Sequence, residues 1–131
     1  MKALTQNMMT SGARFVELLD KSGLKPKAAF WIYNPEQDAW QLLVGHVDTI
    51  DDAAFDAAVA ELMALHDTEL PELALTDIGL AFDDAPILEL LNSVVNTGDE
   101  ILGINFSREE INGVVIDGVF LYRMNITEPV F

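Results

Sequence analysis

The chain has 131 residues and a mass of 14.4 kDa, which is the size of one ordinary domain, and half of its residues are apolar. This composition excludes an intrinsically disordered chain, and the absence of cysteine excludes thiol catalysis, disulfide staples and thiolate metal sites. Seven basic residues stand against 22 acidic residues, and the resulting net charge of −15 argues against non-specific attraction to nucleic acid or anionic lipid.

Charge is unevenly distributed along the chain. Residues 1–30 hold five of the seven basic residues, whereas residues 31–131 hold 20 of the 22 acidic residues, so a large acidic surface is expected. Residues 1–15 lack the apolar run of a signal peptide, and the chain has no stretch of about 18 consecutive apolar residues. We therefore expect a cytoplasmic protein with no membrane contact. Because no linker or repeat divides the chain, we expect a single domain over residues 1–131.

The N-terminal third predicts a helix followed by a β-hairpin. Apolar residues at spacings of three, four and seven over 3–20 indicate an amphipathic helix, which Gly23 would end. Aromatic and aliphatic runs over 28–34 and 39–47 then flank a cluster of turn-forming residues over 34–38. This arrangement predicts the two antiparallel strands of a hairpin.

The middle third predicts two helices on either side of a strand. Thr49 fits the N-cap of a helix that runs to about His66, with acidic residues in its first turn. Alternating apolar residues over 73–82 predict a strand with a break near Asp77. A third, short helix is expected over 86–96.

The last third predicts two further strands, 101–106 and 114–124, joined by a polar connection over 107–113. The Asn-Gly pair at 112–113 favours a tight turn, so Gly118 is predicted to form a bulge within the final strand. The complete order α-ββ-α-β-α-ββ predicts an α+β fold. In this fold a mixed, mostly antiparallel sheet carries helices on one face.

Three stretches of the chain resemble an uncharacterised family of small prokaryotic α+β proteins. They are AAFWIYNPEQDAWQL (28–42), LTDIGLAFDDAPILELL (75–91) and INGVVIDGVFLYR (111–123), and they contain the aromatic hairpin, the Asn-Gly turn and a closing Tyr-Arg pair. The similarity spans nearly the whole chain. It implies a bacterial protein with this order of elements, and it carries no activity, cofactor or catalytic residue.

His46 and Asp48 are the strongest candidates for a catalytic or metal-binding pair. Side chains two residues apart at the end of a strand point the same way, so the imidazole and the carboxylate could share a proton or a divalent metal ion. The alternative is structural and is favoured, because helix starts commonly collect acidic residues. His66 falls where a helix should end, which also has a structural explanation. No cofactor is predicted.

Four aromatic residues are candidates for contacting a partner: Trp31, Tyr33, Trp40 and Tyr122. Rings on a hairpin face could stack on a partner's ring, although such residues more often belong to a core or an interface. The strands over 101–106 and 114–124 are apolar on both faces, and helices on one side of the sheet would leave its other face uncovered. We therefore predict a homodimer that buries this face.

Arg108 and Arg123 are the only basic residues after Lys27. Because 20 acidic residues surround them in the sequence, each arginine is expected to hold a carboxylate partner. Arg123 lies in a predicted strand, so it is expected to be partly buried.

Three functions remain open from the sequence. The leading one is a non-enzymatic, acidic module that binds a protein partner or itself, because this function requires only the composition. An alternative is a nucleic-acid mimic that blocks a DNA- or RNA-binding protein, although the acidic residues are sparse for imitating a phosphate backbone. A further alternative is a small enzyme or divalent-metal binder that uses His46 and Asp48.

Overall fold

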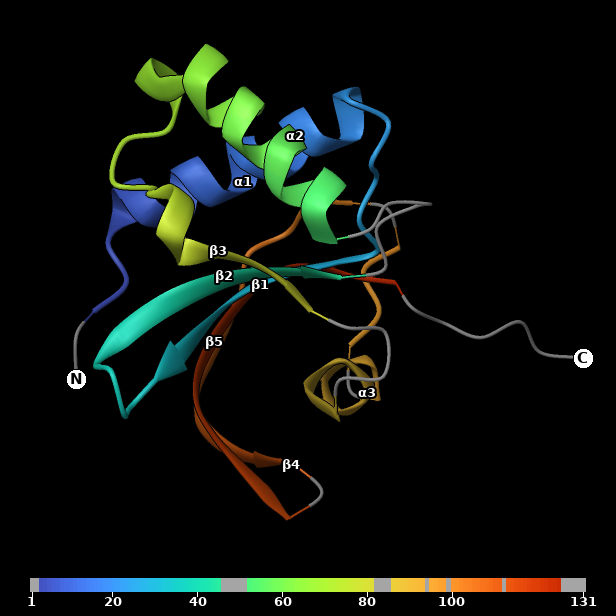
Figure 1. The fold of residues 1–131 in the computed structure, drawn as a ribbon. Coiled ribbons are helices and arrows are strands. Elements are labelled where there is room, and N and C mark those ends of the chain that lie inside the picture. The colour runs from blue at the N-terminus through green and yellow to red at the C-terminus, as the bar shows by residue number, and fades with distance from the viewer. Residues whose placement is uncertain are drawn as a thin grey trace, which may run out of the picture.

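The computed structural model describes residues 3–45, 52–81, 86–93, 95–98, 100–111 and 113–125. Its elements are α1 (Gln6–Lys21), β1 (Ala28–Asn34), β2 (Ala39–Gly45), α2 (Asp52–Leu65), β3 (Ile78–Ala81), α3 (Pro86–Asn92), β4 (Ile104–Ile111) and β5 (Val114–Met124), with short 3-10 turns η1 (Asp67–Glu69) and η2 (Leu75–Asp77) (Figure 1). The fold is α+β, and its order of helices and strands is the predicted one.

The five strands form one mixed sheet in the order β3-β2-β1-β5-β4. The predicted hairpin is confirmed, because β1 and β2 pair antiparallel from Ala28 opposite Gly45 to Asn34 opposite Ala39. The pairs β1–β5 and β4–β5 are also antiparallel, whereas β2 and β3 are parallel. The sheet is therefore mostly antiparallel, as the sequence predicted.

Helices cover both faces of the sheet (Figure 1). On one face α1 and α2 pack over a core that includes Trp31 of β1 and Phe15 of α1. On the other face Leu88 and Leu91 of α3 pack with Phe30 of β1. This corrects the expectation of helices on one face only. Because β1 buries both of its faces, its apolar residues require a cover on each side.

Two strand predictions in the second half of the chain were wrong in extent. Residues 73–77 do not continue β3, since the segment Leu75–Asp77 forms the turn η2 and pairing begins at Ile78. The polar connection predicted over 107–113 is largely strand, because β4 runs to Ile111. Polar residues suit this position, since β4 is the outermost strand of the described sheet. Gly113 adopts a φ of +82°, which fits the predicted turn.

The bulge in β5 lies at Tyr122 and not at Gly118. Gly118 pairs with Ser107 in the continuous β4–β5 register, whereas the β1–β5 register shifts between Ala29 and Phe30. Tyr122 is the extra residue of β5 at this shift, since Arg123 lies opposite Ala29. A bulge changes the alternation of side chains, so two successive residues of β5 can both reach α1.

Both residues at the bulge do contact α1. The Tyr122 hydroxyl donates a hydrogen bond to the carbonyl of Met9 and accepts one of 3.0 Å from Nε1 of Trp31. Arg123 donates two hydrogen bonds of 2.8 Å to the two carboxylate oxygens of Asp20, and a third of 3.0 Å to the Pro26 carbonyl. The expected burial of Arg123 beside a carboxylate is thereby confirmed. The bulge therefore attaches β5 to both ends of α1.

Candidate interaction surface

The four aromatic candidates for partner contact lie in the core or at its margin. Trp31 and Tyr122 are 0% and 1% exposed, and Tyr33 and Trp40 are 9% and 8% exposed. Trp31 and Tyr122 are fully occupied within the chain, because they bond to each other beneath α1. Trp31 and Tyr122 are therefore core residues, Trp40 lines two surface hollows, and contact of the four aromatic residues with a partner stays a prediction.

The predicted His46 and Asp48 pair lies outside the described residues. Within the described part of the chain, no group of three or more His, Asp or Glu side chains could hold a metal ion. The same residues contain no helix that is long and apolar enough to cross a membrane. Arg108 is described only as a backbone position in β4, so its predicted carboxylate partner stays a prediction.

A hollow of about 390 Å³ opens between the start of α1, β2 and the β4–β5 ribbon, and none of the described residues that line it is charged. We call it the apolar hollow. Its lining residues are Leu4, Met9, Trp40, Asn105, Phe106, Gly118 and Phe120. On a protein with a net charge of −15, a hollow whose described lining residues carry no charge is a place where apolar surface meets solvent.

The lining residues are held by contacts with the core behind them. Phe120 packs edge-on against Tyr122, with ring centroids 5.4 Å apart, and lies opposite Asn105 across the β4–β5 pair. Trp40 packs against Tyr33 at 5.5 Å, and the Tyr33 hydroxyl donates a hydrogen bond to Asp38 in the hairpin turn. The walls of the apolar hollow are therefore preorganised by the sheet.

A second hollow of about 350 Å³ is also bordered by Trp40. We call it the acidic hollow. Its lining residues are Ala3, Thr5, Met8, Ala39, Trp40, Glu72 and Asp77. The Thr5 hydroxyl donates to Glu72 at 3.2 Å, and the Ala74 amide donates to Asp77 at 3.1 Å. These two bonds orient both carboxylates.

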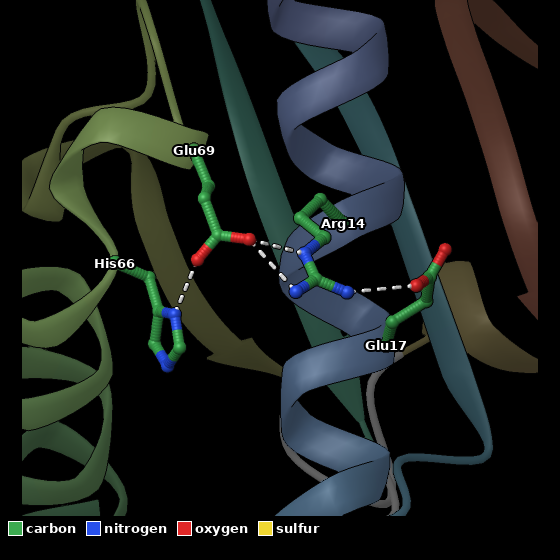
Figure 2. A network of polar contacts seen from close by, with 4 residues as sticks. All are labelled: Arg14, Glu17, His66 and Glu69. Carbon is green, nitrogen blue, oxygen red and sulfur yellow. Dashed lines mark hydrogen bonds and ion pairs between the residues drawn. The ribbon is translucent and has the colours of Figure 1, made fainter.

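A polar network joins α1 to the segment that carries Glu72 (Figure 2). Arg14 donates to Glu69 through Nε at 3.0 Å and Nη2 at 2.8 Å, and to Glu17 through Nη1 at 3.1 Å. His66 Nδ1 lies 2.5 Å from the other oxygen of Glu69. The Ser11 hydroxyl also donates to the Pro71 carbonyl at 2.6 Å. The network fixes residues 66–72 against α1, which is a structural role.

The pKa of the Glu69 carboxyl lies below its usual value because it accepts hydrogen bonds from His66 and then from Arg14. The same contact with Glu69 raises the pKa of Arg14. A carboxyl whose pKa is lowered by folding binds fewer protons in the folded state, so it stabilises that state above its ordinary pKa. This contribution is lost as the pH falls through the lowered pKa.

We expect Glu69→Gln to lower the melting temperature most at pH values above the ordinary glutamate range of about 4.3. The difference from the wild-type protein should shrink as the pH falls below that range, because the wild-type carboxyl then becomes protonated. Thermal unfolding followed by circular dichroism at a series of pH values measures this. Glu61→Gln on the exposed side of α2 is the charge-matched control. Parallel curves for Glu69→Gln and wild type would contradict the role of the Glu69 charge.

Sequence reasoning missed three residues that define the surface: Glu72, Asp77 and Phe120. The carboxylates reach Trp40 only through the folding of residues 66–77 back onto α1, and no local pattern signals that contact. Phe120 falls within a predicted apolar strand, and its place in the hollow depends on the segments around α1, β2 and β4 that contribute most of the other lining residues.

The comparisons with known proteins give no relative: no protein-family model, curated protein or solved structure matches the chain. The resemblance to small prokaryotic α+β proteins therefore stays an expectation.

Proposed function

We propose that this protein is a non-enzymatic interaction module that binds a protein partner through the apolar hollow. The observation that carries the proposal is that the described residues lining this hollow, from Leu4 and Met9 on one side to Phe120 on the other, carry no charge. Apolar surface of this kind favours association, since covering it removes it from water. It also favours a protein partner over nucleic-acid mimicry, because a phosphate-like surface is built from charged groups.

The proposed binding uses a rigid site. Phe120 and Trp40 are each packed against a tyrosine behind them, so little side-chain entropy is lost when a partner covers them. A largely preformed hollow with aromatic walls is the usual setting for an anchoring side chain of a partner.

Self-association as a homodimer is a second form of the same proposal, and the face beneath α3, which shares Phe106 with the apolar hollow, supports it. Ile32, Leu43, Ile104 and Phe106 lie half-buried around the core beneath α3. The seven-residue α3 covers part of the face that the sequence predicted to be bare, so the dimer contact is smaller than that prediction assumed. A copy related by a twofold axis would bury these four residues.

A photo-crosslinking experiment tests the proposal in the native cell. A benzophenone amino acid replaces exposed Asn105 in the apolar hollow or, as the control, exposed Ala57 on α2. We expect one discrete product from position 105, identified by mass spectrometry and absent from position 57. Leu4→Ser in the same chain should remove the product, because Leu4 borders the hollow ahead of α1.

The outcomes of this experiment are distinct. A product that contains one other protein supports the heterologous module, and a product of two copies of this chain supports self-association. Light scattering of the purified protein at about micromolar concentration checks the second form, with twice 14.4 kDa expected for the homodimer. The absence of a product at position 105, or the same products at both positions, would overturn the proposed function.

A further inference from the structure

We propose that the partner's binding segment is an extended, basic and aliphatic stretch of polypeptide. Its apolar side chain would enter the apolar hollow, and a neighbouring lysine or arginine would enter the acidic hollow. This inference rests on the proposed function and adds the chemistry of the partner.

The two hollows adjoin at Trp40. Trp40 lines both hollows. Residues around the start of α1 are divided between them: Leu4 and Met9 line the apolar hollow, and Thr5 and Met8 line the acidic hollow. A ligand that fills the apolar hollow therefore has the acidic hollow directly beside it. Successive residues of an extended chain are about 3.3 Å apart, so one short segment can reach across Trp40.

The two carboxylates that line the acidic hollow favour a positively charged side chain of the partner. Glu72 and Asp77 each accept one hydrogen bond from the chain, and a carboxylate can accept several more. Among the described residues, no lysine, arginine or histidine forms an ion pair with either of them. Arg14, the basic residue of α1 on this side, is engaged with Glu17 and Glu69. A positively charged side chain of a partner could therefore pair with Glu72 and Asp77, which no described basic residue of this chain neutralises.

The position of the two hollows favours an extended segment as the occupant. The apolar hollow reaches from Asn105 of β4 to Trp40 of β2, and the acidic hollow reaches from Trp40 to Asp77. An extended backbone places successive side chains about 3.3 Å apart and can therefore supply a side chain to each hollow. A second copy of this chain fits less well, because it brings its own net charge of −15 to a surface that already carries two carboxylates.

Three synthetic peptides test the inference on the full-length protein. The first is acetyl-GSGKLKGSG-amide, the second replaces its leucine by serine, and the third replaces both lysines by glutamate. Binding is followed by shifts of backbone amide signals in ¹⁵N-labelled protein. We expect the first peptide to shift signals of both hollows with a Kd below about 1 mM, and the other two to bind at least about tenfold more weakly.

Protein variants distinguish a specific contact with Glu72 and Asp77 from attraction by the overall negative charge of the protein. The double variant Glu72→Gln, Asp77→Asn should weaken binding of the first peptide at least about threefold and reduce its dependence on salt. The control Asp56→Asn, Glu61→Gln removes the same charge from the exposed side of α2 and should leave binding unchanged. Equal loss in both double variants, or equal binding of all three peptides, would overturn the inference.

Failure of this inference is distinguishable from failure of the proposed function. Crosslinking at position 105 reports any partner in the apolar hollow, whatever the charge of that partner. A crosslinked partner together with unchanged binding in the Glu72→Gln, Asp77→Asn variant would reject the basic segment and leave the interaction module standing.

Discussion

Replacing Gly12 by alanine should destabilise the protein strongly, although alanine is the better helix former. A Cβ atom at Gly12 would lie 2.3 Å from the Tyr122 hydroxyl oxygen and 2.7 Å from Nε1 of Trp31. Both distances are far inside van der Waals contact. The hydrogen bond that joins Trp31 to Tyr122 is itself buried, so neither ring has space into which to move.

The size of the effect follows from two opposing contributions. Alanine in a helix gains about 1 kcal/mol over glycine. Overpacking of a buried site costs about 1–3 kcal/mol, and here it also threatens the bonds of Tyr122 to Trp31 and Met9. We expect Gly12→Ala to lower the free energy of unfolding by about 2 kcal/mol or more, measured by urea denaturation.

Two companion variants locate the cause of this loss. Thr10→Ala, at an exposed position of the same helix, should leave stability nearly unchanged. Tyr122→Phe removes the atom nearest to the new methyl group, so Gly12→Ala should cost less in that background than in the wild-type protein. If the Gly12→Ala variant were as stable as the wild-type protein, α1 could not lie this close to β5.

Arg123→Met should produce the second large loss of stability. Arg123 is 5% exposed, and its guanidinium holds both carboxylate oxygens of Asp20 at 2.8 Å as well as the Pro26 carbonyl at 3.0 Å. Methionine retains much of the apolar length of the arginine side chain but has none of its hydrogen-bond donors. Asp20 would then keep a charge without its partner, and removal of one member of a buried ion pair is strongly destabilising.

The Asp20 side chain is 31% exposed, and water would therefore compensate part of the lost contact. We expect Arg123→Met to lower the free energy of unfolding by about 2 kcal/mol, again measured in urea. Asp20→Asn in the Arg123→Met background should recover part of this loss, because it removes the uncompensated charge. Arg14→Met, which breaks ion pairs nearer to solvent, should have a much smaller effect. An unchanged urea midpoint for Arg123→Met would contradict the structural role of this pair.

A double-mutant cycle measures the interaction between Asp20 and Arg123 directly. The double variant Asp20→Asn, Arg123→Met removes both partners, so comparison of the two single variants with the double variant isolates their interaction. A coupling near zero would mean that the two residues contribute independently.

Local patterns in the sequence determined the types and order of the elements. The aromatic and aliphatic runs over 28–34 and 39–47, separated by turn-forming residues, predicted the two strands that the structure shows as β1 and β2. The spacing of three and four residues predicted α1, which begins after its cap Thr5 and ends before Gly23 with a φ of +86°. Composition alone also predicted that Arg123 would need a carboxylate.

The tertiary structure decided which of these elements meet. The bulge at Tyr122, the packing of α3 on the second face and the position of Glu72 beside Trp40 each depend on segments far apart in the chain. A local pattern records the periodicity of one element, whereas a register shift or a shared hollow depends on how two elements dock. Gly12 shows the difference: within α1 it is an unfavourable helix residue, and only contact with Trp31 and Tyr122 makes it necessary.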